Sequence, residues 1–178
     1  MTDFKTAFDF MMVNEDGPAP YRYKTVDDTG GFAISGINSK AFPDEFQIIA
    51  SIPQADRGPW VENFYKLHFW NQWLEQLESD DVAKRVFDAA VNMGSRTGCK
   101  ILQKAINALD GDTPVTEDGQ WGPSTVKWAN TCHSNDLVNA FKTSRLDYYA
   151  AIVEKHPENA RYFGSVIKPG PWWVRAVK

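Results

Sequence analysis

The sequence predicts an all-α, or at least α-dominated, fold. Apolar residues recur at helical spacing along most of the chain, and helix caps and terminators separate these segments. Stretches that alternate apolar and polar residues, as half-buried strands do, are scarce. The 178 residues, 43% of them apolar, suffice for one well-buried core or a compact main domain with a smaller appendage.

The first predicted helix ends in an acidic residue. Phe4, Phe8, Met11 and Glu15 follow one another at spacings of four, three and four, which places the carboxylate on the apolar face. A carboxyl group half buried against apolar walls has a raised pKa, as a general acid of a glycosidase needs near neutral pH. The structural alternative is a charged residue at the end of an amphipathic helix.

A loop rich in glycine and proline follows this helix. Pro18 and Pro20 end the helix, because proline lacks an amide donor and biases the preceding residue away from helical geometry. Gly30 and Gly31 allow positive φ angles or a close approach to a ligand. Asp28 is either a second polar group of the same site or a turn residue that hydrogen-bonds its own backbone.

The middle of the chain predicts three helices. After an irregular stretch to Pro59, residues 60–77 carry apolar side chains at helical spacing. Ser79 caps the next helix, which Gly94 ends, and a third helix continues to Leu109.

The last third predicts a polar joint followed by more helices. Residues 110–122 are rich in turn formers and are the one plausible subdomain joint, and Pro123 suits a first helical position. Ser134 or Asn135 begins the longest helix, which Pro157 ends. A short helix and an aromatic tail close the chain.

Composition excludes several classes of function. A net charge of −4 without a basic run argues against nucleic acid as a partner. Cys99 and Cys132 have neither metal-knuckle nor redox spacing, so they are expected to be structural thiols, and the three histidines are scattered. The acidic residues of the joint lack the final glutamate of a calcium loop; they are Asp110, Asp112 and Asp118. We therefore expect no metal and no cofactor.

The chain shows neither a secretory signal at its start nor an integral membrane segment. We accordingly expect synthesis in the bacterial cytoplasm without a signal peptide. Seven Trp, eleven Phe and six Tyr supply a core and also suit the stacking of sugar rings, although core packing is the commoner use.

The order of several motifs resembles a known family. An apolar helix ending in Glu15, a short loop, Asp28-x-Gly30-Gly31 and then Gly36-Ile37 resemble the N-acetylmuramidases of phage endolysins and secretion activators, glycoside hydrolase family 108. The second half is similar to the family's C-terminal region, a predicted peptidoglycan-binding domain. The fragments that carry this likeness are 87–94, 102–105, 118–125, Arg145 with Tyr148 and Tyr149, and 172–175.

The resemblance implies a lysozyme-like helical fold and hydrolysis of the bond between N-acetylmuramic acid and N-acetylglucosamine in peptidoglycan. The family's catalytic glutamate falls on Glu15, and Asp28 is the candidate for the second carboxylate, with Asp16 and Asp27 as rivals. Its role would be that of a base, a nucleophile or an electrostatic stabiliser.

Two positions depart from the family pattern. Asp16 stands in place of the first glycine of the family's Glu-Gly-Gly motif, which here reads Glu15-Asp16-Gly17. Ala33 stands where the family usually has a threonine, whose hydroxyl could place a water or a sugar group. Ser35 and Thr25 are the candidates to replace that hydroxyl.

The substrate-binding candidates come from the loop and the following helices. For the aromatic ones core packing is the structural alternative, and for the asparagine it is a helix cap. The candidates are Tyr21, Gly30, Gly31, Ser35, Tyr65, Trp70 and Asn92.

The sequence thus predicts residues 1–90 as the muramidase region and 91–178 as the peptidoglycan-binding region, packed as one compact unit. We expect a monomer that acts on peptidoglycan strands in the cell wall after a holin or a secretion machinery releases it. Two other classes stay open: a catalytically weak or inactive peptidoglycan-binding protein that assists secretion or lysis, and an intracellular helical interaction module without a glycan ligand.

Overall fold

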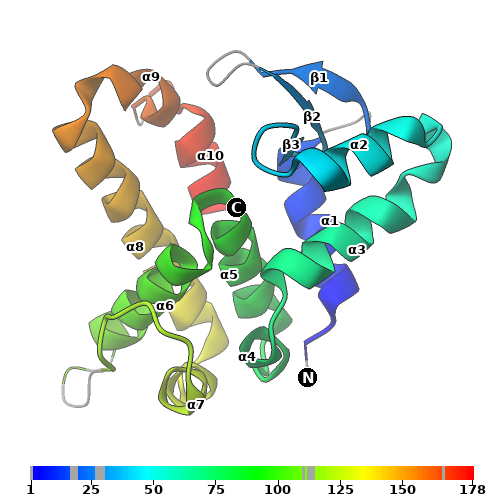
Figure 1. The fold of residues 1–178 in the computed structure, drawn as a ribbon. Helices are drawn as coiled ribbons and strands as arrows, with labels where there is room; N and C mark the ends of the chain where they lie inside the picture. Colours follow the sequence, from blue (N-terminus) through cyan, green and yellow to red (C-terminus); the bar gives the residue numbers. More distant parts are fainter. Residues whose placement is uncertain (1, 17–19, 27–30, 110, 112–114, 166) are drawn as a thin grey trace.

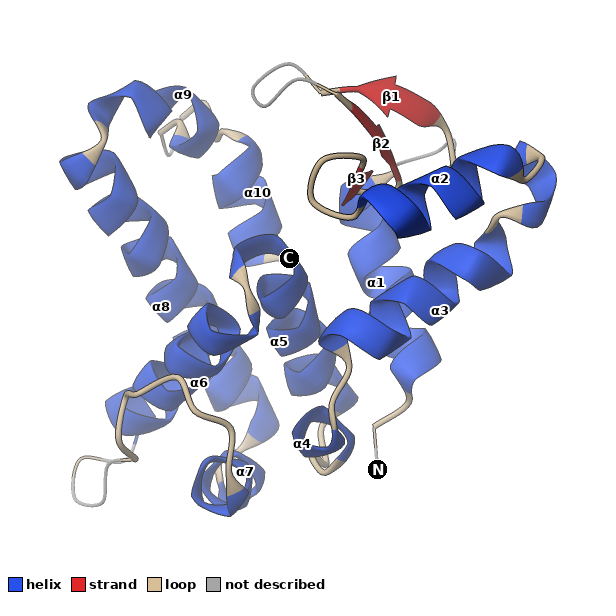
Figure 2. Cartoon of the chain, viewed as in Figure 1, coloured by secondary structure: helices blue, strands red, loops and turns tan. Residues whose placement is uncertain are grey.

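A computed structural model describes residues 2–16, 20–26, 31–109, 111, 115–165 and 167–178. The described residues form mainly helices with one small sheet (Figures 1 and 2), which confirms the α-dominated prediction. The elements in chain order are α1 (Phe4–Glu15), β1 (Tyr23–Thr25), β2 (Phe32–Ile34), β3 (Ile37–Asn38), α2 (Pro43–Ser51), α3 (Gly58–Phe69), α4 (Gln72–Glu75), α5 (Asp80–Met93), α6 (Ser95–Leu109), α7 (Pro123–Thr131), α8 (Ser134–Lys155), α9 (Ala160–Phe163) and α10 (Pro171–Val177), with 3-10 turns η1 (Gln54–Asp56) and η2 (Pro157–Asn159).

Helix α5 lies at the centre of the molecule. It packs against α1, α3 and α4 on one side and against α6 and α8 on the other (Figure 1). Its buried positions face both sides, and one of them, Asp88, is charged. The predicted boundary between residues 90 and 91 falls inside this helix, so the two predicted regions share a core element.

Helix α1 carries its apolar residues to that core and leaves its last residue at the edge. Asp3 caps the helix by accepting hydrogen bonds from the amides of Lys5 and Thr6. Phe4 and Phe8 are buried against Trp70 and Tyr65.

No helix in the described part of the chain combines the length and the hydropathy that a membrane crossing requires.

The loop after α1 contains a sheet that the sequence did not predict. The strands pair antiparallel in the order β1-β2-β3, with Ile34 opposite Ile37. Ser35 and Gly36 join β2 to β3 with φ angles of 51° and 81°, and two positive φ angles are what a tight two-residue hairpin requires. Strands of two and three residues are too short to show a clear alternation, which explains the omission.

Two helical predictions need correction. The single helix expected over 60–77 is α3 followed by α4, because Trp70 is extended and Asn71 accepts hydrogen bonds from the amides of Trp73 and Leu74 as a new cap. The stretch expected to be irregular contains α2, which begins at Pro43. The Ser79 cap of α5 and the starts of α7 and α8 agree with the sequence prediction.

Candidate active site

Glu15 lies at the end of α1, where two cavities meet. Its side chain is 18% exposed, in agreement with its place on the apolar face of the helix. The larger cavity has a volume of about 620 Å³, and the smaller one about 220 Å³. Gly36 is the other residue that borders both. The larger cavity is further lined by Lys24, Thr25, Val26, Ala33, Arg161 and Tyr162, and the smaller one by Phe42, Phe64, Tyr65, Phe69, Val91, Asn92 and Arg175.

The Ser35–Gly36 turn brings backbone directly against the Glu15 carboxylate. A Cβ atom built on Gly36 would lie 2.6 Å from Glu15 Oε2 and 2.7 Å from Tyr65 Oη. Tyr65 fixes the turn, because its hydroxyl donates a 2.5 Å hydrogen bond to the Ser35 carbonyl. Burial and the charge of Glu15 raise the pKa of Tyr65 well above its usual value, so the phenol stays a neutral donor.

Asp16 follows Glu15 and has a structural role. It is buried and accepts hydrogen bonds from the Ser35 hydroxyl, from the Tyr21 amide at 2.7 Å and from Lys24 Nζ at 3.1 Å. These contacts tie the hairpin to the end of α1. Asp16 therefore fixes the loop through these contacts, and it lines neither cavity.

An arginine near the C-terminus contacts the Glu15 side chain. Arg175 Nη2 lies 2.7 Å from Glu15 Oε1 and 2.8 Å from Asp88 Oδ1, so one guanidinium bridges two carboxylates. Burial opposes the charge of Arg175, but the contacts with Asp88 and Glu15 raise its pKa above the ordinary value. The surroundings of Glu15 therefore include a cation as well as the apolar walls that the sequence predicts.

Asp88 anchors this arrangement in the core. Its side chain is fully buried and also receives Arg145 Nη1 at 2.8 Å and Asn14 Nδ2 at 3.0 Å. Burial alone would raise the pKa of Asp88, but Arg175 and Arg145 more than offset this, and the pKa lies below its usual value. Two carboxylates and two guanidiniums thus form a compact cluster whose formal charges cancel. Its members are Glu15, Asp88, Arg145 and Arg175.

Stacked aromatic rings hold α10 where Arg175 can reach Glu15. Trp172 lies between Tyr149 of α8 and Tyr162 of α9, with ring centroids 5.0 and 5.4 Å apart. Tyr149 Oη in turn donates a 2.5 Å hydrogen bond to Asn92 Oδ1. The aromatic tail noted in the sequence therefore orients the helix that carries Arg175.

The predicted site residues do not all meet at Glu15. Tyr65 and Asn92 line the smaller cavity, whereas Tyr21, Gly31, Ser35 and Trp70 border neither cavity. Trp70 packs between Phe4 and Phe87 in the core and donates from Nε1 to Glu75. Four further predictions lie outside the described residues; they concern Asp27, Asp28, Gly30 and the calcium reading of Asp110 and Asp112.

The two candidates for the missing threonine hydroxyl lie in different environments. Thr25 lines the larger cavity together with Ala33 and Glu15. Ser35 is fully buried and donates to Asp16. Thr25 is therefore the hydroxyl that faces the same space as Ala33.

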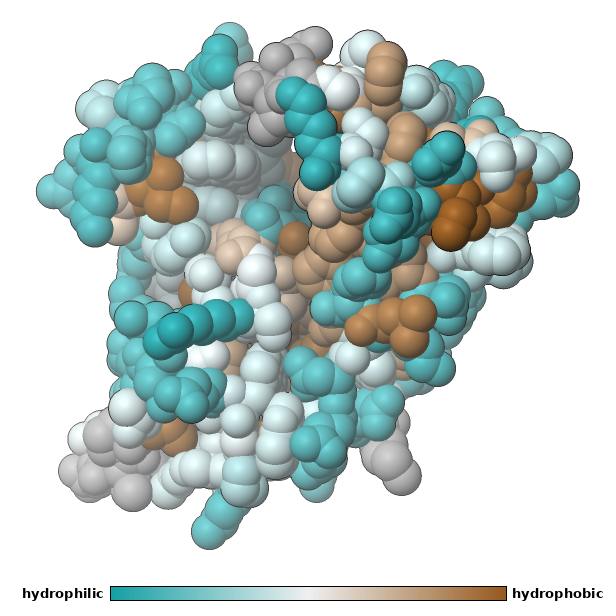
Figure 3. Space-filling model, viewed as in Figure 1, coloured by the Kyte–Doolittle hydropathy of each residue, from teal (hydrophilic) through white to brown (hydrophobic). Residues whose placement is uncertain are grey.

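The larger cavity lies between the hairpin and α9. Its lining joins Lys24 and Thr25 of β1 to Arg161 and Tyr162 of α9, and Figure 1 shows these elements on opposite sides of the upper part of the molecule. Figure 3 shows the surface receding between them. Among the described residues, Glu15 is the one carboxylate that lines either of the two cavities. The arrangement offers a proton donor or acceptor in a groove with polar and apolar walls.

The sequence predicts Glu15 as a candidate, but not its contact with Arg175 or the contacts of Arg175 and Arg145 with Asp88. Their pairing is long-range, since Arg175 contacts Asp88 across 87 residues and Arg145 contacts it across 57. Helical spacing places Asp88 with Asp81, Lys84 and Arg85 on the polar face of α5, so the periodicity does not mark it, yet its side chain is fully buried. A charge at such a position requires buried partners of opposite sign.

Comparison with known proteins supports a site that acts on a glycan. Residues 11–94 match the family Glycosyl hydrolase 108, and residues 97–169 match the family Predicted Peptidoglycan domain. Both matches confirm the resemblance read from the sequence, and Arg175 lies beyond both ranges. The structure of SagA from Brucella abortus is similar over 88% of this chain and 86% of that chain, with a TM-score of 0.60 and 18% identity, which shows a shared fold. No curated protein matches the chain.

Proposed function

We infer that the chain is a peptidoglycan hydrolase, because residues 11–94 match Glycosyl hydrolase 108 and residues 97–169 match the Predicted Peptidoglycan domain, and we propose that it is an N-acetylmuramidase with Glu15 as the general acid. The observation that carries the proposal is the position of Glu15. It is a half-buried carboxylate between two cavities, inside the range matched by the hydrolase family. A cavity of about 620 Å³ lies within the usual range of ligand sites.

In the proposed reaction Glu15 donates its proton to the glycosidic oxygen while the sugar ring on the other side of the bond gains oxocarbenium character. Oε1 contacts Arg175, and Oε2 lies beside Gly36, which borders both cavities. Oε2 is accordingly the atom that we assign to proton transfer. We keep Asp28 as the proposed second carboxylate, with Asp27 as its rival.

Arg175 acts through Glu15 in this proposal, as a positioning residue. The guanidinium contacts Glu15 Oε1 and so fixes the orientation of the carboxylate. Asp88 binds the same guanidinium and holds it in place.

The test is the release of reducing ends from purified sacculi. The wild-type chain is expected to release them, and Glu15→Gln, which keeps the shape but removes the acid, is expected to lower the rate by at least about 100-fold. Glu62→Gln is the matched control, because Glu62 is also partly buried but borders neither cavity. Equal rates for the wild type and Glu15→Gln contradict the assignment.

Ala33 favours a second candidate, a peptidoglycan-binding protein with little turnover. This residue lines the larger cavity at the position where the resemblance leads us to expect a threonine. The second candidate predicts that the wild-type chain pellets with sacculi without releasing reducing ends. Sedimentation measured on the same samples separates the two functions.

A further inference from the structure

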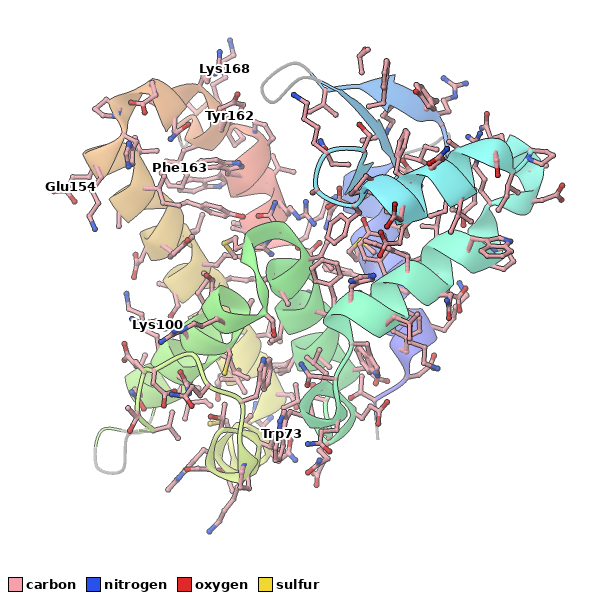
Figure 4. All side chains as sticks on the ribbon, viewed as in Figure 1. Trp73, Lys100, Glu154, Tyr162, Phe163 and Lys168 are labelled. Atoms are coloured by element: carbon pink, nitrogen blue, oxygen red, sulfur yellow. The ribbon has the colours of Figure 1, made fainter. Side chains whose placement is uncertain are left out.

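A second groove lies between α6 and α8, away from Glu15. Its volume is about 360 Å³, and it shares no lining residue with the two cavities of the active site. Figure 4 shows Lys100 beside α6, on the far side of the molecule from the hairpin, whereas Tyr162 lies near α9. The groove is lined by Arg96, Thr97, Lys100, Ile101, Lys104, Glu117, Ser144, Asp147, Tyr148 and Ala151.

Three cations stand in a row along one wall of this groove. Arg96, Lys100 and Lys104 recur every four residues on α6 and therefore project from one face. Like charges at this spacing weaken a helix. Lys104 lies 3.7 Å from Asp147, a contact between two half-exposed side chains, and no ion pair among the described residues engages Lys100. Arg96 Nε also donates a 3.2 Å hydrogen bond to the Asp118 carbonyl, so Lys100 is the member of the row whose position these contacts do not explain.

The rest of the groove supplies an apolar floor and two acids. Ile101 and Ser144 are buried at its base, with the ring of Tyr148 beside them. Glu117 and Asp147 add negative charge at the rim. The groove thus offers a cationic wall, a narrow apolar floor and carboxylates within a single cavity.

We propose that this groove binds the peptide stem of peptidoglycan. A stem peptide carries free carboxylates, alanine methyl groups and, in many bacteria, the ammonium group of a diamino acid. Lys100 and Arg96 match the carboxylates, Ile101 accepts the methyl groups, and Asp147 matches the ammonium group. All lining residues except Arg96 lie within the range matched by the predicted peptidoglycan domain.

The proposal assigns separate parts of the substrate to separate parts of the chain. The glycan strand occupies the cleft at Glu15, and a peptide stem binds the groove between α6 and α8. The inference goes beyond the hydrolase proposal, because the groove can bind a peptide whether or not Glu15 cleaves the glycan.

The experiment is a calorimetric titration of the full-length Glu15→Gln chain with a free tetrapeptide of L-alanine, D-isoglutamate, meso-diaminopimelate and D-alanine. Binding is expected, and Lys100→Glu is expected to weaken it about tenfold or more, because an attractive charge contact becomes repulsive. Lys127→Glu on α7 is the matched control, since it makes the same change at an exposed helical lysine outside the groove. The thermal unfolding midpoint of the Lys100→Glu chain, compared with that of the chain without this change, excludes a folding defect as the cause.

Two results overturn the proposal: no binding of the tetrapeptide to the Glu15→Gln chain, or equal weakening by Lys100→Glu and Lys127→Glu. Hydrolysis of a peptide-free glycan is measured in parallel on the otherwise wild-type chain with Lys100→Glu. Failure of the hydrolase proposal removes turnover and leaves peptide binding, whereas failure of this inference leaves turnover and removes peptide binding. The two proposals therefore fail in distinguishable ways.

Discussion

Gly36 leaves no room for a side chain beside the Glu15 carboxylate. Its φ of +81° and its contacts with Glu15 Oε2 and Tyr65 Oη both exclude a Cβ atom. The glycine in the Gly-Ile pair read from the sequence therefore has a geometric reason. It lets the tight turn of the hairpin approach the proposed acid.

Replacement of Gly36 by alanine is expected to displace the Glu15 carboxylate and to reduce the hydrolysis rate by about 100-fold. Gly94→Ala is the control: Gly94 has a similar φ of +88°, but a Cβ there meets no atom within 4 Å. Gly94→Ala therefore imposes the strain of an alanine at positive φ without a clash between its Cβ atom and a neighbouring side chain. The rates on sacculi decide, and equal losses in the two variants argue against a special role for the Gly36 contact.

Thr25 is the hydroxyl that we expect to replace the family's threonine. Thr25→Val removes the hydroxyl at nearly constant volume and is expected to lower turnover about tenfold. Adding Ala33→Thr to this variant is expected to restore activity, because both side chains line the larger cavity. Hydrolysis of sacculi is measured for the single and the double variant. Unchanged activity after Thr25→Val contradicts this role of the Thr25 hydroxyl.

At the scale of elements, α10 completes the proposed active site. It brings Arg175 to Glu15 and Asp88, and Trp172 stacks it between α8 and α9. The helix belongs to the C-terminal part of the chain, yet its charge acts at the end of α1. A helix that lies beyond both matched ranges therefore contributes to the proposed site.

Arg175→Met is expected to reduce kcat about 100-fold with little change in KM, because the carboxylate loses its orientation while the cavities remain. Arg175→Lys keeps the charge without the forked geometry and is expected to recover part of the loss. Steady-state kinetics on soluble glycan of both variants gives the answer. A change in KM alone would indicate a substrate contact instead of a positioning role.

Asp88 connects α5 to α8 and α10 through buried charges. Asp88→Asn leaves Arg145, which is 1% exposed, without its carboxylate partner, and this is expected to cost about 3–5 kcal/mol in the free energy of unfolding. Urea unfolding at neutral pH measures the loss. Asp136→Asn, a change at an exposed aspartate on α8, is the control and is expected to have little effect.

The same residue predicts a pH dependence of stability. The folded-state pKa of Asp88 lies below the ordinary aspartate value of 3.8, so its contribution to stability is present above the unfolded pKa and is lost as pH falls through the folded pKa. The wild type is expected to lose stability on acidification below about pH 4, and Asp88→Asn is expected to lose less over the same interval. Parallel slopes in a urea series at decreasing pH contradict this role of Asp88.

At the scale of the whole molecule, the sequence predicted the features that depend on neighbouring residues, such as helices. It did not predict the contacts between residues that are far apart in the chain. The periodicity of α1, α5 and α8, the cap at Ser79 and the helix start at Pro123 were sufficient for the helical fold. The break at Asn71 and the short hairpin were missed, because a single cap and strands of two or three residues leave little pattern.

The candidate site follows the same division. Glu15 could be found from its place at the end of an apolar stripe, since that signal lies within one helix. Arg175 could not, because its contact with Glu15 joins the two ends of the chain through tertiary packing. Trp70 illustrates the converse, as an aromatic residue at helical spacing that packs in the core.

We propose above all that Glu15 is the acid for cleavage of the bond between N-acetylmuramic acid and N-acetylglucosamine, which leaves N-acetylmuramic acid at the new reducing end. The measurement that tests it most directly is mass spectrometry of borohydride-reduced fragments released from sacculi by the wild-type chain and by Glu15→Gln. The proposal predicts fragments that end in reduced N-acetylmuramic acid for the wild type and almost none for the variant. Fragments that end in reduced N-acetylglucosamine, or equal release by both chains, contradict it.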